Sequence, residues 1–149
     1  MNDLFATIYE TWFNLFNPKF DLIFAALYYD GGYVEFGLLF ILLPLLLFLL
    51  FYYVWKYPYG KFWHWSLWLL ITTVIVSGLT YSIANSEIFA SENKDLIKAL
   101  NDPNSGFEQL AKTLIPKYAL ANGILTIGVG FIYSLILKQF SKIQIHLPF

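Results

Sequence analysis

The sequence predicts an all-α integral membrane protein with three transmembrane helices, and three observations lead to this fold class. The 149 residues are 58% hydrophobic and only 13% charged, a balance typical of small multi-span membrane proteins. Residues 36–55 form an uncharged apolar run, and at about 1.5 Å per residue such a helix matches the thickness of a bilayer's hydrocarbon core. Two further runs without Asp, Glu, Lys or Arg follow at 62–84 and 118–137. Residues 1–149 are therefore predicted to form a single membrane domain, with no room for a separate catalytic domain.

The N-terminal segment, residues 1–35, is predicted to lie in the membrane interface. Residues 3–17 show the periodicity of a short amphipathic helix, with Asp3 as its N-cap and Asn17-Pro18 at its end. The helix is too short to span, so it is expected in the interface or packed on the spans or on another subunit. Its apolar face consists of Leu4, Phe5, Ile8, Trp12, Leu15 and Phe16.

A second apolar run, residues 21–29, has about half the length of a span and predicts an interfacial or re-entrant piece. Asp30-Gly31-Gly32 then has the composition of a turn. Residues 36–84 are predicted to form a transmembrane hairpin, with a type I turn at Tyr57–Gly60. Pro44 predicts a kink in the first span, because proline removes a backbone hydrogen bond.

Small and hydroxylated residues form one stripe on each of the last two spans. On the second span the stripe comprises Ser66, Thr73, Ser77, Thr80 and Ala84, of which the last four share one helix face. On the third it comprises Ala119, Gly123, Thr126, Gly130 and Ser134. Such stripes let helix backbones approach closely, so these are helix-packing candidates, either with each other or between protomers.

Residues 85–117 are the largest polar stretch and predict an extracytoplasmic helical loop. Ser91 is the expected cap of a short helix, residues 102–106 form a turn, and Ser105 with Glu108 matches a capping box. Pro116 is expected in the first turn of the third span. The amphipathic face after the turn is a candidate partner-binding surface, unless the chain's own helices cover it; it consists of Phe107, Leu110, Ala111 and Leu114.

The distribution of charge predicts the orientation. The hairpin loop carries Lys56 and Lys61 and the segment 118–149 ends in a tail with Lys138 and Lys142, and neither stretch carries an acid. Residues 1–35 instead hold five acids against Lys19 alone. The positive-inside rule then places the N-terminus outside and the C-terminus inside, in a bacterial inner membrane or, alternatively, an organellar inner membrane.

Few residues offer chemistry. The chain has no cysteine and no arginine, and its net charge is −1, so thiolate metal sites and nucleic-acid binding are not expected. The most polar residue inside a span is Asn122, which is expected to form an interhelical hydrogen bond rather than to bind a ligand. A haem or metal site would require His64 and His146 to converge, and no cofactor, metal or enzymatic activity is expected.

Three functions remain open from the sequence. The first is a structural, anchoring or assembly subunit of a larger membrane complex, with the lipid bilayer and other subunits as partners. The second is a homo-oligomeric pore, because the three-span layout with an outer N-terminus resembles that of the larger phage holins. This resemblance is one of layout and rests on no motif. The third is a small carrier or lipid-binding protein.

Overall fold

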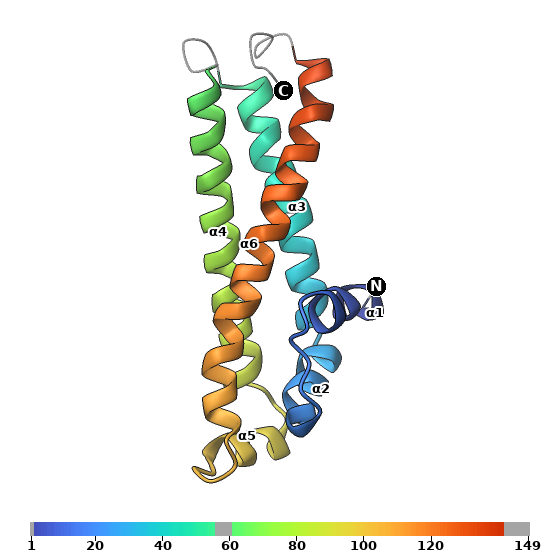
Figure 1. Cartoon of the computed structure of the whole chain (residues 1–149), viewed down its shortest axis with the longest axis vertical. Helices are drawn as coiled ribbons and strands as arrows, with labels where there is room; N and C mark the ends of the chain where they lie inside the picture. Colours follow the sequence, from blue (N-terminus) through green and yellow to red (C-terminus); the bar gives the residue numbers. More distant parts are fainter. Residues whose placement is uncertain (1, 56–60, 142–149) are drawn as a thin grey trace.

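The computed structural model describes residues 2–55 and 61–141, and all regular structure in this part of the chain is helical, without a strand. Three long helices run side by side, with short elements at one end and one side (Figure 1). The long helices are α3 (Gly32–Tyr53), α4 (Phe62–Phe89) and α6 (Phe107–Phe140). The short elements are α1 (Asn2–Thr7), the π-helical turn η1 (Ile8–Trp12), the 3₁₀ turn η2 (Pro18–Phe20), α2 (Asp21–Tyr29) and α5 (Lys94–Asn101).

The three long helices confirm the predicted number of apolar helices. They contain 22, 28 and 34 residues, and each is long and apolar enough to cross a membrane. All three pack on one another along their lengths. Most of their outward side chains are apolar, as in the exposed leucines at positions 38, 42, 46 and 50 of α3.

The predicted limits of these helices were too short. Helix α3 begins at Gly32 instead of residue 36, α4 continues past residue 84 to Phe89, and α6 begins at Phe107 instead of residue 118. Pro116 consequently lies inside α6 and not in its first turn. The helix continues through it because a proline removes only one helical hydrogen bond, to the carbonyl of Lys112, and the position is solvent- or lipid-exposed.

Helix α3 also continues through Pro44, which is buried. Side chains of the neighbouring helices donate to backbone carbonyls on both sides of it. The Tyr133 hydroxyl donates to the Ile41 carbonyl at 3.2 Å, and Trp68 Nε1 donates to the Leu47 carbonyl at 3.0 Å. These bonds tie α6 and α4 to the backbone of α3 one turn before and one turn after the proline.

The N-terminal segment differs from the predicted helix over residues 3–17. Helix α1 already begins at Asn2, so Asp3 is not its N-cap, and helical structure ends at Trp12 after the π turn. Its buried side chains are Phe5, Ala6 and Tyr9, whereas 62% of Leu4 and 74% of Trp12 is exposed. The polar tyrosine is buried because the bundle offers its hydroxyl an acceptor, described below, which hydrophobic periodicity alone does not reveal.

The bounds of the second apolar run and the turn after it are confirmed: the run forms the helix α2 (Asp21–Tyr29), and Gly31 follows with φ of +88°. A positive φ is unstrained only for glycine, which explains the residue choice in this turn. Figure 1 shows α2 and α5 together at one end of the long helices. There α2 packs against α3, α4 and α5 and buries Ile23, Phe24 and Leu27.

Two predicted caps were wrong, although the turn between them is present. Asn93, not Ser91, caps α5, and its Oδ1 accepts from the backbone N–H groups of Asp95 and Leu96. The N-cap of α6 is Gly106 with φ of +75°, so no capping box forms. Ser105 Oγ accepts from the Phe107 N–H at 3.3 Å, while Glu108 forms an ion pair with Lys112 at 2.5 Å.

Candidate functional site

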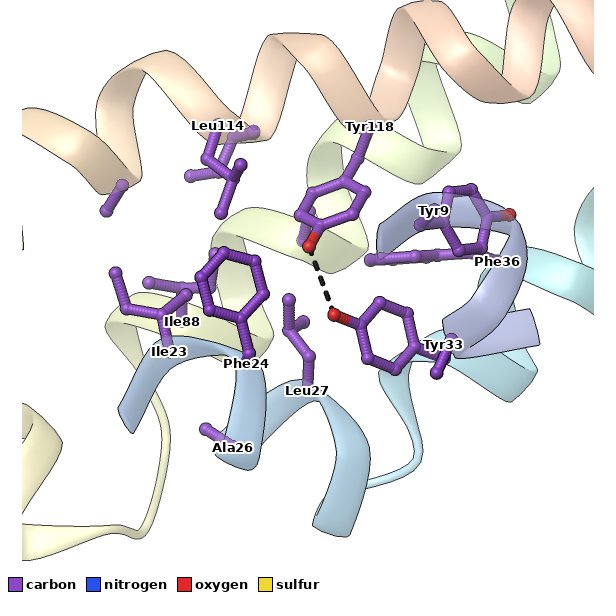
Figure 2. Close-up of a cluster of buried hydrophobic side chains, with 14 of the residues drawn as sticks. Tyr9, Ile23, Phe24, Ala26, Leu27, Tyr33, Phe36, Ile88, Leu114 and Tyr118 are labelled. Carbon is purple, nitrogen blue, oxygen red and sulfur yellow. Dashed lines mark hydrogen bonds between the residues drawn. The ribbon is translucent and has the colours of Figure 1, made fainter. Parts of the chain in front are cut away.

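The most polar part of the buried interior lies where the N-terminal segment meets the long helices. Four rings from three elements meet there: Tyr9 of η1, Tyr33 and Phe36 of α3, and Tyr118 of α6 (Figure 2). Their side chains are fully buried. The Tyr9 ring stacks on Tyr33 at a centroid distance of 5.8 Å and meets Phe36 and Tyr118 edge-on at 5.8 and 5.6 Å. Such geometries are favourable beyond the area that they bury.

Asn122 of α6 connects this ring cluster to the backbone and to α4. Its Oδ1 accepts a hydrogen bond from the Tyr9 hydroxyl, and its Nδ2 donates to the Phe36 carbonyl at 3.1 Å and to Thr80 Oγ1 at 2.7 Å. Thr80 in turn donates to the Val76 carbonyl at 2.8 Å. One carboxamide therefore joins η1, α3, α4 and α6, and both of its polar atoms are satisfied.

A second set of hydrogen bonds leads outward from the same rings. The hydroxyls of Tyr33 and Tyr118 are 3.2 Å apart, and the Tyr33 hydroxyl donates to Glu10 Oε1 at 2.7 Å. Glu10 is half-buried, so its carboxylate lies between the buried rings and the protein surface. Because Tyr33 donates to Glu10, the Tyr118 hydroxyl is the donor to Tyr33.

The local sequence explains why these groups converge. Tyr118 and Asn122 are four residues apart in α6, and Tyr33 and Phe36 are three apart in α3, so each pair shares one helix face. Burial raises the pKa of the Tyr9 hydroxyl, which keeps it protonated and able to donate to Asn122. The arrangement is therefore a set of neutral hydrogen bonds with a single carboxylate at its outer edge.

No protein-family model, curated protein or solved structure matches this chain. Among residues 2–55 and 61–141, no group of three or more His, Asp or Glu side chains is arranged to hold a metal ion. His64 lies in the first turn of α4, and His146 falls outside the described residues, as do Lys142 and the turn predicted at Tyr57–Gly60.

The structure places the small-residue stripe of α6 on its buried face: Ala119, Gly123, Thr126, Gly130 and Ser134 are all buried. A Cβ atom on Gly123 would lie 2.7 Å from Ser77 Oγ and 3.4 Å from Thr73 Cγ2, so the two stripes meet there. One on Gly130 would lie 2.8 Å from Leu69 Cδ1 of α4 and 3.0 Å from Phe48 Cε2 of α3.

The stripe of α6 also supplies a hydrogen bond near the opposite end of the bundle. Trp65 Nε1 of α4 donates to Ser134 Oγ at 2.8 Å, and Ser134 donates to the Gly130 carbonyl at 2.8 Å. On α4, Thr80 and Ala84 are buried, and Thr73 and Ser77 are half-buried.

The candidate partner-binding face is covered by the chain itself. Ala111 and Leu114 are buried in the same core as α2, and Leu110 and Phe107 pack against that core. The Phe107 ring meets Phe20 of η2 at a centroid distance of 4.9 Å. The chain's own helices therefore cover Ala111 and Leu114, while Phe107 and Leu110 are half-buried at the edge of that core.

Sequence reasoning identified Asn122 but missed the tyrosines around it and the role of Glu10. Residues 9, 33 and 118 come from three distant segments, and no spacing within one segment links them. The only signal was local: Tyr118 lies one helical turn from Asn122, on the same face.

Proposed function

We propose that this chain is a non-enzymatic, multi-pass membrane protein that acts as a structural, anchoring or assembly subunit of a larger membrane complex. In this proposal α3, α4 and α6 cross the bilayer, with the N-terminus outside and the C-terminus inside. A bacterial inner membrane is the expected location. The helix lengths, the apolar outward faces and the acid-free basic segments support this arrangement.

One observation carries the proposal: two buried polar side chains of the interior, Asn122 and Ser134, hold the elements together. Asn122 bonds to three other elements, and Ser134 accepts from Trp65. The small stripes of α4 and α6 are likewise occupied by packing within one chain. Side chains engaged in this way stabilise a fold, and they are not free to bind a substrate or to line a water-filled pore.

The pore alternative would require the polar faces of the long helices to point towards a shared lumen. Thr80, Asn122, Thr126 and Ser134 instead point inward and are buried in a single chain. A carrier would need a polar pocket within the bundle. These placements favour the subunit function over both alternatives.

The surface that we propose for a partner is the outer face of the N-terminal segment. Leu4, Ile8 and Trp12 lie at successive intervals of four residues; Leu4 and Trp12 are exposed, and Ile8 is half-buried at the edge of the core. Together with Asp3 and Thr7 they line an open concavity of about 510 Å³. An apolar concavity on a segment that the bundle holds in place is the kind of surface that a helix of another subunit can fill.

Purification from its native membrane in mild detergent tests the proposal. We expect stoichiometric partner proteins with the wild-type chain, and their loss from a Leu4→Ser/Trp12→Ser variant. A Leu120→Ser/Ile132→Ser variant, which changes exposed apolar residues of α6, is the matched control and should retain the partners. A large homo-oligomer without partners would favour the pore instead, and an isolated monomer would contradict both.

A further inference from the structure

An apolar groove lies on the outside of the bundle between α3 and α4. It has a volume of about 340 Å³ and is lined by Leu38, Leu39, Leu42, Leu43 and Leu46 of α3 and Ile83 of α4. From Leu38 to Leu46 the groove follows α3 for about 12 Å, at about 1.5 Å per residue. Along these residues the groove is an elongated hydrocarbon surface, and its shape suits an extended alkyl chain.

One charged side chain lines the end of this groove. Glu35 precedes the uncharged run of α3 that starts at Phe36, so its carboxylate lies where the hydrocarbon region ends. Glu87 of α4 lies at the same end of the helix pair, with its Cγ 3.5 Å from the Cβ position of Gly32. Neither carboxylate is in a salt bridge with any residue that the structure describes.

We propose that this groove binds an acyl chain of a phospholipid whose headgroup ends in a primary ammonium, the chemistry of phosphatidylethanolamine. The alkyl chain lies along the leucines, and the ammonium donates to the Glu35 carboxylate. A charge-assisted hydrogen bond of this kind is stronger than one between neutral groups. The inference rests on the part of the proposed function in which α3 and α4 span a bilayer.

The chemistry of the groove selects this lipid over the two common alternatives. A choline headgroup has no N–H to donate and is typically held by aromatic rings, whereas no aromatic side chain lines the groove. An anionic headgroup such as phosphatidylglycerol would be repelled by Glu35 and Glu87. The predicted order of binding is therefore ethanolamine, then choline, then glycerol.

Native mass spectrometry of the full chain in mild detergent tests this order directly. The three phospholipids, with identical acyl chains, are added at equal concentrations. Exposed ion pairs contribute about 0.2 to 1 kcal/mol, so we expect about 1.4- to fivefold more bound ethanolamine lipid than choline lipid. Glu35→Gln should reduce this ratio to about one. Glu108→Gln, which removes an exposed carboxylate at a distance in sequence from the groove, should leave it unchanged.

A second variant tests the groove itself. Leu42→Trp places a large ring on the exposed side of α3, where Leu42 is 48% exposed and has space to change without disturbing the core. It should lower the amount of bound ethanolamine lipid, with an unchanged helical circular dichroism spectrum. Equal binding of the three lipids, a preference for the anionic lipid, or an unchanged ratio in Glu35→Gln would overturn the proposal. These outcomes are independent of partner recovery and topology, which test the proposed function.

Discussion

At position 122 the chain places a carboxamide where three neighbouring elements each offer a complementary group. Tyr9 supplies a hydroxyl donor, and the Phe36 carbonyl and Thr80 Oγ1 supply acceptors. A buried polar group is costly when unpaired, so each partner depends on the others being present. This dependence makes the interaction between Tyr9 and Asn122 measurable as a coupling energy.

Asn122→Leu should lower the free energy of unfolding by about 1 to 3 kcal/mol, because it leaves the buried Tyr9 hydroxyl without its acceptor. Tyr9→Phe should cost about 1 kcal/mol by leaving Asn122 Oδ1 unpaired. The double variant removes both polar groups, so its loss should be smaller than the sum of the two by about 0.5 to 1 kcal/mol. Denaturant unfolding in detergent measures all three values, and strict additivity would mean that the two side chains do not interact.

Gly123 and Gly128 form a matched pair on α6. A Cβ atom on Gly123 would crowd Ser77 Oγ at 2.7 Å, whereas one on Gly128 meets nothing within 4 Å. Gly123→Val should therefore destabilise the chain by about 1 to 3 kcal/mol relative to Gly128→Val, because overpacking forces α4 and α6 apart. The two changes share the same helix propensity, so a difference in melting temperature in detergent reports packing. Equal melting temperatures would show that the helices do not approach closely at Gly123.

At the scale of elements, composition predicted the three long helices, the apolar run marked the bounds of α2, and turn chemistry predicted the turn at Gly31. The ends of elements were less predictable, because several residues that can cap a helix lie close together in the sequence. The N-cap of α5 is Asn93 and not Ser91, and the N-cap of α6 is Gly106 and not Ser105. The candidate site was predicted only at Asn122. Its tyrosines are brought together by tertiary packing between segments about 20 to 110 residues apart, which local periodicity does not encode.

Pro116 gives a test that separates the predicted helix limit from the one in the structure. Inside α6 it deprives the Lys112 carbonyl of a helical partner, whereas in a first turn it would have removed nothing. Pro116→Ala should therefore raise the free energy of unfolding by about 1 to 2 kcal/mol. This is a net gain, because alanine favours the helix interior but also gives the unfolded chain more conformational freedom than proline does. Thermal unfolding in detergent measures the change. No gain, or a loss, would indicate that a helix begins near residue 116.

At the scale of the whole molecule, the two ends of the bundle differ in character. One end carries α2, α5 and the acid-rich loops, and the N-terminal segment packs against the bundle on the side (Figure 1). The opposite end carries Lys61, immediately before α4, and Lys138 in the last turn of α6. An odd number of spans would place these ends on opposite sides of a membrane, and the proposed surfaces for a partner and for a lipid headgroup would both face outward.

Site-directed cysteine labelling tests this arrangement most directly, because the native chain has no cysteine. Asn104 and Lys61 are both exposed and lie at opposite ends of the bundle, one in the turn before α6 and one immediately before α4. In intact cells, Asn104→Cys should react with a membrane-impermeant thiol reagent, and Lys61→Cys should react only after the membrane is permeabilised. Reaction of both cysteines in intact cells would contradict three spans, and the reverse pattern would contradict the outward orientation of the N-terminal segment.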